Sequence, residues 1–214
     1  MSVRAWRAEP YRDALLTGQG PLFLRRDDGW VLPLEVERWC AAPDSADVTV
    51  LARCRGPVLD IGCGPGRLVV ALAALGTTSL GLDVSQEAVD RTVREGGAAL
   101  CRSVFDPLPD EGSWGTALLM DGNIGIGGAP ENLLNRVSEL IGPNGTLIVE
   151  TAAQDIDERV EVRFCNGRGA RGAAAFPWAR AGTRALLAYA EATGWTAEDQ
   201  WRAAGRNFLQ LRRR

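Results

Sequence analysis

Three glycines and two acidic residues carry the clearest chemical signal in this sequence. Asp60 stands two residues before the turn Gly62-Cys63-Gly64-Pro65-Gly66, and Asp83 follows further along the chain. Glycine has no Cβ, so backbone built from it can approach a ligand closely. The helix that follows such a turn begins with free N–H groups that hold a polar group. An acid placed like Asp83, roughly 20 residues after the turn, binds ribose hydroxyls in doubly wound folds.

The spacing of these glycines differs from that of a dinucleotide site. A dinucleotide fingerprint has the order G-x-G-x-x-G and holds a pyrophosphate, whereas the glycines here alternate and follow Asp60. A carboxylate repels a pyrophosphate and attracts an α-amino group. The pattern therefore predicts a cofactor with a ribose and an amino-acid end, and without a pyrophosphate. The alternative is a glycine turn that only links a strand to a helix.

Two segments resemble the first two motifs of the class I S-adenosylmethionine-dependent methyltransferases: residues 60–66 (DIGCGPG) and 81–85 (GLDVS). The resemblance implies that S-adenosylmethionine is the cofactor, that S-adenosylhomocysteine is the product, and that the enzyme belongs to class EC 2.1.1. Ser103 stands where many relatives have an acid that binds adenine. By resemblance, the cofactor-binding residues are Asp60, Gly62, Cys63, Gly64, Gly66, Asp83, Val84, Ser103, Val104, Phe105 and Asp121.

Alternating strands and helices must position these residues. Five apolar segments predict strands, at residues 58–61, 79–82, 98–101, 116–120 and 146–150. Periodic or capped segments predict helices at residues 34–40, 46–53, 68–75, 85–95 and 131–141. This alternation predicts an α/β fold with a three-layer αβα arrangement. By resemblance, it is a Rossmann-like, doubly wound sheet of seven strands with the last strand antiparallel.

The last third of the chain is predicted to complete the sheet and to add one pair of antiparallel strands. Residues 160–164 alternate like an exposed antiparallel strand, and residues 171–175 are expected to form its return strand. The aromatic residues Phe176 and Trp178 follow, as a substrate wall or as a support under the next helix. That helix is predicted at residues 182–193, and an edge hairpin is predicted from residues 195–201 and 207–211.

Three residues are candidates for catalysis. Asp121 and Asn123 follow the fourth predicted strand of the sheet, and ligands of doubly wound folds bind at the carboxyl ends of strands. We expect one of them to orient the nucleophile, the alternative being a flexible loop before a helix. Tyr11 is the third candidate, since the N-terminal segment often covers the site in the resembling family. A general base would have to be Asp121 or Tyr11, because the sequence has neither histidine nor lysine.

We expect one compact domain with an N-terminal helical or lid segment, residues 1–55, and a methyltransferase domain, residues 56–214. Aromatic residues near the N-terminus, among them Trp6, Tyr11 and Phe23, alternate with arginines. They form either an extension packed on the core or a lid that excludes water from the site.

Composition narrows the classes of partner. The 214 residues are 46% hydrophobic and carry a formal net charge of -3, which is typical of a globular protein and gives no field that attracts nucleic acid. The five cysteines form no C-x-x-C pair, so we expect free thiols in the cytoplasm and no metal site. The N-terminal residues lack the pattern of a signal peptide, and no apolar run has membrane-spanning length.

The leading hypothesis is methyl transfer from S-adenosylmethionine to an O, N or C atom of a small-molecule acceptor. One alternative keeps the cofactor and changes the chemistry to a cyclisation or an elimination. Another is a non-catalytic partner protein that binds S-adenosylmethionine. Methylation of nucleic acid is a weaker alternative, because the [DNS]-P-P-[YF] pattern of enzymes that methylate exocyclic amines of bases is absent. The oligomeric state is left open.

Overall fold

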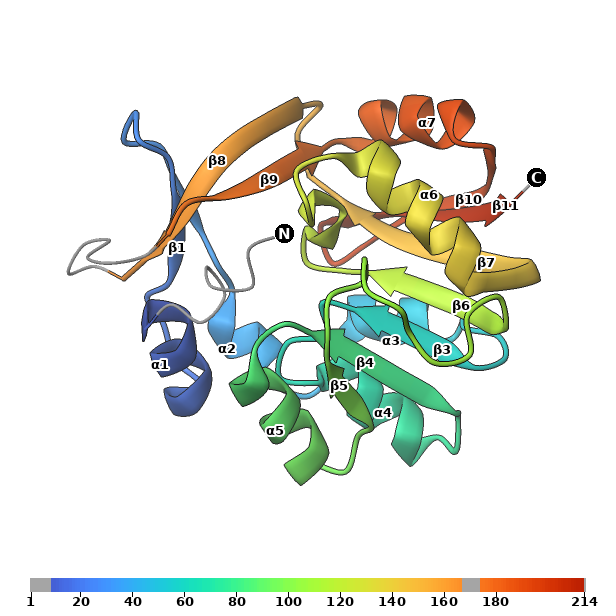
Figure 1. Ribbon diagram of the computed structural model, residues 1–214, viewed down its shortest axis with the longest axis horizontal. Helices are drawn as coiled ribbons and strands as arrows, with labels where there is room; N and C mark the ends of the chain where they lie inside the picture. The colour runs from blue at the N-terminus through green and yellow to red at the C-terminus, as the bar shows by residue number, and fades with distance from the viewer. Residues whose placement is uncertain (1–8, 167–173, 214) are drawn as a thin grey trace.

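A seven-stranded sheet forms the centre of the computed structural model, which describes residues 9–166 and 174–213 (Figure 1). The strand order is β10-β11-β7-β6-β3-β4-β5, and β11 is antiparallel to both of its neighbours. The predicted Rossmann-like sheet with its last strand antiparallel is confirmed. Its strands are β3 (Val58–Ile61), β4 (Ser79–Asp83), β5 (Ala99–Cys101), β6 (Trp114–Leu119), β7 (Ile141–Thr151), β10 (Trp195–Ala203) and β11 (Arg206–Arg213).

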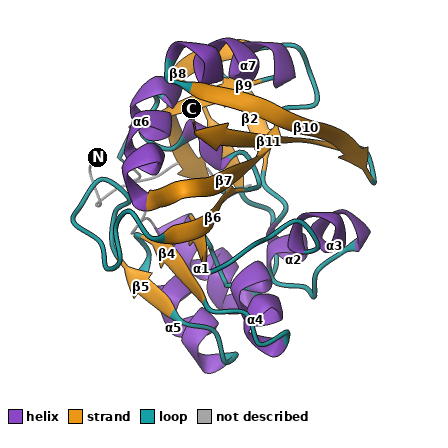
Figure 2. Ribbon diagram, turned by 90° about the vertical axis from the view of Figure 1, so that its right-hand side faces the viewer, coloured by secondary structure: helices purple, strands orange, loops and turns teal. Residues whose placement is uncertain are grey.

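Helices cover both faces of this sheet, as Figure 2 shows. Leu59 and Ile61 of β3 belong to the apolar core shared with α6 and α7, whereas Val58 belongs to the core shared with α3 and α4. Alternate residues of a strand point to opposite faces, so this division marks the sheet as the middle layer of three. The helices around it are α3 (Ser45–Leu51), α4 (Arg67–Ala74), α5 (Gln86–Arg94), α6 (Pro130–Leu140) and α7 (Thr183–Ala192).

Of a second, antiparallel sheet of four strands, only the strand at residues 160–164 was predicted. Its order is β2-β1-β8-β9, with β1 (Phe23–Arg25), β2 (Val31–Pro33), β8 (Asp157–Cys165) and β9 (Phe176–Ala181). Phe23 pairs with Cys165, so the N-terminal hairpin joins a strand from the last third of the chain. Figure 1 shows β1, β8 and β9 beside the ends of the central strands where ligands bind in doubly wound folds.

The N-terminal segment packs on this second sheet. Helix α1 (Glu9–Thr17) buries Tyr11 and Leu15, and α2 (Val36–Trp39) buries Val36. These side chains share a third core with Phe164 of β8 and with α5. Trp6 lies outside the described residues. The aromatic residues at positions 11 and 23 therefore belong to folded elements, α1 and β1.

The prediction of a return strand at residues 171–175 was wrong at residues 174 and 175, which lie outside any strand. Residues 171–173 lie outside the described part, and the strand that pairs with β8 is Phe176–Ala181. This strand contains Pro177, which cannot donate a hydrogen bond to a ladder. It is tolerated here because β9 is the edge strand of its sheet. None of the helices in the described part of the chain is long and apolar enough to cross a membrane.

Candidate functional site

A cavity that is open to solvent lies between the carboxyl ends of the central strands and the second sheet. Most of the residues predicted from the sequence line it. These are Tyr11, Asp60, Gly62, Cys63, Gly64, Asp83, Val84, Ser103, Val104, Asp121 and Asn123. Gly66 and Phe105, also predicted, are not part of its lining. The structure thus brings two separate motifs and the loop after β6 to one place.

The glycine turn has two different functions. Gly62 has φ +75° and borders the cavity, where an added Cβ would lie 2.6 Å from the Asn123 side chain. Gly66, with φ +87°, lies below the cavity, where an added Cβ would lie 2.4 Å from Oγ1 of Thr92. Glycine is required at Gly66 by the contact between the start of α4 and α5, not by a ligand.

The Asp83 carboxylate is fixed in the cavity wall. Its Oδ2 accepts a hydrogen bond from the Gly64 N–H at 2.9 Å, and its Oδ1 accepts one from the Ser85 N–H at 2.9 Å. Burial raises the pKa of Asp83 to about 6, although these backbone hydrogen bonds act in the opposite direction. Each oxygen keeps a lone pair, so the carboxylate can accept hydrogen bonds from two hydroxyls of a ligand.

Asp60 is buried without a hydrogen-bond partner for its carboxyl group among the described residues. It is 2% exposed and lines the same cavity. Burial raises its pKa to about 7, and the nearby Arg67 offsets part of that rise. A buried carboxylate without a partner is costly. Such a group suits a ligand that brings a positive charge.

Asp121 is surrounded by arginines. Its oxygens lie 2.5 Å from Nη1 of Arg38, 3.0 Å from Nη2 of Arg67 and 3.4 Å from Nη2 of Arg206. Its backbone has φ +55°, an unusual conformation for a residue other than glycine. Because the three guanidinium groups bind the oxygens of this carboxylate, it is poorly suited to accept a proton from a substrate.

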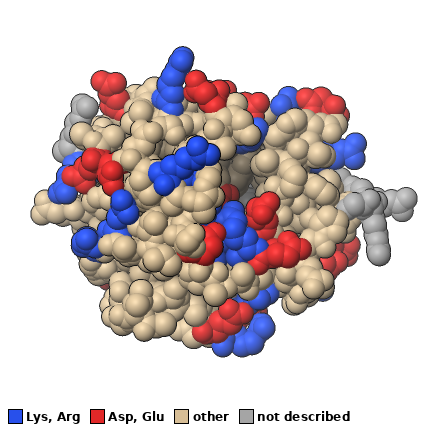
Figure 3. All heavy atoms as spheres, turned by 180° about the vertical axis from the view of Figure 1, so that it is seen from behind, with Lys and Arg blue, Asp and Glu red and all other residues tan. Residues whose placement is uncertain are grey.

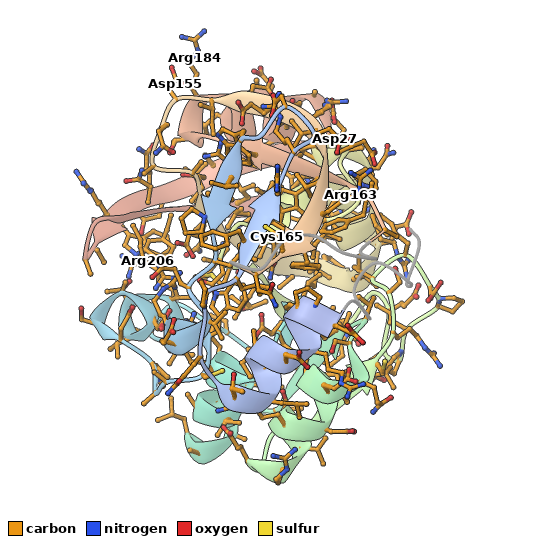
Figure 4. All side chains as sticks on the ribbon, turned by 90° about the vertical axis from the view of Figure 1, so that its left-hand side faces the viewer. Asp27, Asp155, Arg163, Cys165, Arg184 and Arg206 are labelled. Atoms are coloured by element: carbon orange, nitrogen blue, oxygen red, sulfur yellow. The ribbon has the colours of Figure 1, made fainter. Side chains whose placement is uncertain are left out.

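Arg206 connects this group to the rest of the fold. Figure 4 labels Arg206, which belongs to the C-terminal hairpin. Its guanidinium contacts Glu150 at 2.7 Å and Asp47 of α3 at 2.9 Å. Arg67, in turn, contacts Asp47 at 3.0 Å. The resulting network ties the loop after β6 to β7, β11, α3 and α4.

Asn123 lies in a short 3-10 helix, Asn123–Gly125, and supports the glycine turn. Its Nδ2 donates hydrogen bonds to the carbonyl oxygens of Ile61 and Gly62, each at 2.9 Å. Both of its amide hydrogens are therefore used inside the protein. Only Oδ1 is left to meet a ligand, as an acceptor.

Tyr11 reaches the cavity from α1. Its ring stacks on that of Phe164 with the centroids 4.9 Å apart. Burial, together with the negative charge of Asp83, holds its pKa well above the usual value. Tyr11 therefore keeps its proton at neutral pH, which argues against the predicted role of Tyr11 as a general base.

The loop after β5 closes the far end of the cavity. Ser103 and Val104 are buried in its lining. Phe105 is 37% exposed and lies on a neighbouring surface depression. Cys63 is buried, and burial raises its pKa well above the ordinary value, so its thiol is not activated as a nucleophile.

Several residues that line the cavity were not predicted from the sequence. Arg67 directly follows the glycine turn, and a charged residue there was a usable signal. Leu24, Trp39 and Phe164 come from segments with no motif of their own, and no local signal placed them at the cavity. Trp178, left open between two roles, does line it.

Solved structures of low sequence identity share this fold. A SAM-dependent methyltransferase from Bacteroides fragilis, in complex with S-adenosyl-L-homocysteine, is 18% identical with a TM-score of 0.77, over 99% of this chain and 95% of that one. The CcbJ methyltransferase from Streptomyces caelestis is 16% identical with a TM-score of 0.61, over 82% of this chain and 92% of that one. The 1,6-didemethyltoxoflavin-N1-methyltransferase from Burkholderia thailandensis is 18% identical with a TM-score of 0.60, over 79% and 77%.

A family profile described as "Methyltransferase domain" matches residues 44–200, which is well over half of the chain. The match agrees with the two motifs in the glycine turn and after β4, and with the sheet order. The chain belongs to the methyltransferase domain family, the S-adenosylmethionine-dependent enzymes that its motifs resemble.

Proposed function

We propose that this methyltransferase transfers the methyl group of S-adenosylmethionine to a small-molecule acceptor and releases S-adenosylhomocysteine. The observation that carries the proposal is the pair of buried carboxyl groups in one cavity. Asp60 lacks a hydrogen-bond partner in the described part of the chain, and Asp83 is fixed by the N–H groups of Gly64 and Ser85. One suits an ammonium group and the other a pair of hydroxyls, which are the two ends of the cofactor that the motifs imply.

The residues present fit this cofactor. Asp60 binds the amino group, and Asp83 accepts hydrogen bonds from the ribose hydroxyls. Val84, Ser103 and Val104 surround the adenine. When bound, S-adenosylmethionine supplies a methyl group activated by a sulfonium. The chain's own contribution is to hold that group in line with the acceptor, and positioning of this kind supplies much of the rate.

In this proposal, Asp121 and Asn123 help to position the glycine turn and the acceptor. Asp121 is held by three arginines and shapes the floor of the cavity beside the glycine turn. Asn123 keeps the turn in place through Ile61 and Gly62, and it offers Oδ1 to the acceptor. Tyr11 covers the ribose side of the cavity as a protonated side chain.

We infer that residues 1–55 act as a lid on the methyltransferase domain of residues 56–214. Tyr11 of α1, Leu24 of β1 and Trp39 of α2 all line the cavity. A wall that comes from the N-terminal segment can exclude water when it closes over bound molecules.

A small-molecule acceptor fits the surface better than nucleic acid does. The formal net charge is -3. Figure 3 shows acidic and basic side chains interspersed over the face that it draws, without a continuous basic area. Nucleic-acid binding depends on such an area. The chain's five cysteines, free in the structure, support a location in the cytoplasm.

The first test is calorimetric titration of the full chain with S-adenosylmethionine and S-adenosylhomocysteine. We expect micromolar binding of both, lost in Asp83→Ala and kept in Asp90→Ala, an exposed acid on α5. Absence of binding to either compound would overturn the proposal. Analysis of the product then separates the chemistries, because S-adenosylhomocysteine reports methyl transfer and methylthioadenosine reports attack on the other carbon chain.

A further inference from the structure

One side of the cavity is apolar and aromatic. This apolar wall consists of Leu24, Leu34, Trp39, Ile126, Phe164 and Trp178. Phe164 stands in a run of ring contacts, 4.9 Å from Tyr11 and 5.2 Å from Phe176, and Phe176 meets Trp178 edge-on at 6.2 Å. Rings packed against one another in this way form a firm surface for a flat molecule.

Arg67 and Asp121, two charged residues that line the cavity, are already neutralised, and the other arginine of the lining, Arg102, directly precedes Ser103 in the loop assigned to the adenine. Arg67 is paired with Asp47 and Asp121, and Asp121 is also paired with Arg38. An anionic acceptor would lose its hydration without gaining a free counter-charge from these groups. A cationic acceptor would meet the positive charge of the bound cofactor. The wall therefore selects an uncharged acceptor.

The cavity also lacks a residue suited to remove a proton from the acceptor. The whole sequence has no histidine and no lysine, and every acidic residue and tyrosine falls in the described part of the chain. The acids that line the cavity are Asp60, Asp83 and Asp121. The first two are assigned to the cofactor, and the third is held by arginines. An alcohol needs a base before it attacks, whereas an uncharged nitrogen brings its own lone pair.

We propose that the acceptor is an uncharged aromatic molecule that presents a nucleophilic nitrogen, in a ring or as an arylamine, and lies against the apolar wall. This inference rests on the proposed function. The nitrogen lone pair forms a bond to the methyl carbon while the carbon–sulfur bond breaks and its electron pair stays on sulfur. The positive charge passes to nitrogen, and a proton carried by that nitrogen leaves to water afterwards.

Trp39 lines the cavity and carries a hydrogen-bond donor that the described part of the chain does not use. Its Nε1 is buried and makes no hydrogen bond to the described residues. An indole N–H can only donate. A second heteroatom on the acceptor, such as a carbonyl oxygen or another ring nitrogen, satisfies this donor and fixes the orientation of the ring.

The test uses the full chain saturated with S-adenosylhomocysteine and titrated with 1-aminonaphthalene, indazole, quinoline and 1-naphthoate. We expect the three uncharged nitrogen compounds to bind at least ten times more tightly than the anion. Trp178→Leu is expected to weaken their binding about tenfold, consistent with a stacking contribution of about 1 kcal/mol or more. Trp39→Phe is expected to weaken the binding of indazole several-fold and to leave the binding of 1-aminonaphthalene, which has no second heteroatom, unchanged. Trp30→Phe, outside the cavity, is the matched control.

Turnover tests the acceptor atom. With S-adenosylmethionine labelled in its methyl group, we expect label on 1-aminonaphthalene and not on 1-naphthol. Equal binding of 1-naphthoate, an unaffected Trp178→Leu variant that still binds S-adenosylhomocysteine, or faster labelling of 1-naphthol would overturn this inference and leave the proposed function standing. Failure of the unmodified chain to bind S-adenosylhomocysteine would overturn the proposed function instead, and the inference with it.

Discussion

Arg206 and Glu150 face each other from neighbouring strands in a two-point contact, with Nε 2.8 Å from Oε1 and Nη2 2.7 Å from Oε2. Oε2 of Glu150 also accepts the backbone N–H of Asp121 at 2.8 Å. A residue of the C-terminal hairpin thereby holds both the backbone and the side chain of a residue at the cavity. This arrangement stabilises Asp121 in its left-handed conformation.

Replacing Arg206 by alanine is expected to lower the free energy of unfolding by about 3–5 kcal/mol, because it leaves Glu150 buried without its arginine partner and takes from Asp47 one of its two arginines. The Arg206 side chain is 12% exposed, whereas Arg184, paired with Asp155 at 3.8 Å, is 88% exposed. Arg184→Ala is therefore the control, with an expected loss of less than about 1 kcal/mol. Figure 4 labels both arginines. Urea unfolding of the two variants measures the difference, and equal losses would contradict the buried network.

Gly66→Ala is expected to destabilise the fold more than Gly76→Ala. Both glycines have positive φ, +87° and +73°, so alanine at either position costs about 1–2 kcal/mol in backbone strain. At Gly66 the new Cβ would also lie 2.4 Å from Thr92, whereas no heavy atom lies within 4 Å at Gly76. Overpacking of this kind adds about 1–3 kcal/mol. Thermal unfolding compares the variants, and Thr92→Gly in the Gly66→Ala background should recover part of the loss.

Cofactor affinity is expected to increase with pH between about pH 5.5 and 8. Asp60 and Asp83 have pKa values of about 7 and about 6, above the ordinary 3.8, and binding of an amino group requires Asp60 in its ionised form. Titration with S-adenosylhomocysteine across this range measures the effect. Asp60→Asn should weaken binding and remove the upper step, while Asp83→Asn should leave that step in place. A flat profile for the unmodified chain would contradict the assignment of Asp60.

The stability of the unliganded protein is expected to show the opposite trend. Between pH 4 and 7 the folded state binds more protons at Asp60 and Asp83 than the unfolded chain does, because both pKa values are raised by folding. The contribution of these groups to stability is thus present below about pH 4 and is lost as the pH rises through 6 and 7. Urea unfolding of Asp60→Asn at pH 5 and pH 8 should show a smaller decrease than the unmodified chain.

Asn123→Ala is expected to weaken binding of S-adenosylhomocysteine about tenfold. The change removes the two hydrogen bonds to Ile61 and Gly62, each worth about 1 kcal/mol, and loosens the turn that the cofactor contacts. Asn132→Ala, on α6 and outside the cavity lining, is the control. Unchanged affinity in Asn123→Ala would show that the turn keeps its shape without this side chain.

The cofactor half of the site could be predicted because its signals are local. The glycine turn, Asp83 and the loop after β6 each follow a strand of the central sheet, and that sheet fixes where the three loops meet. The arginine network could not be predicted in the same way. Arg38, Arg67 and Arg206 come from three unrelated elements, and no spacing in the sequence relates them to Asp121.

Apart from Trp178, the apolar wall was missed for a different reason. Strand β1 has three residues, Phe23–Arg25, too few for an alternating pattern to stand out. Its partner β8 lies far along the chain, and pairing over such a distance leaves no local trace. Residues expected to be irregular thus became part of a sheet through tertiary contacts alone.

The pairing of β1 with β8 also sets an order of events during synthesis. The ribosome releases α1 and the β1–β2 hairpin before the central strands up to β7, and β8 only after them. Until then Leu22 and Leu24, which are buried in the finished protein, lack strand β8, whose Phe164 shares their core. A chain stalled before β8 presents these side chains to water, which makes it prone to aggregation and dependent on chaperones. The β1–β2 hairpin thus leaves the ribosome before the central strands and pairs with β8 after them.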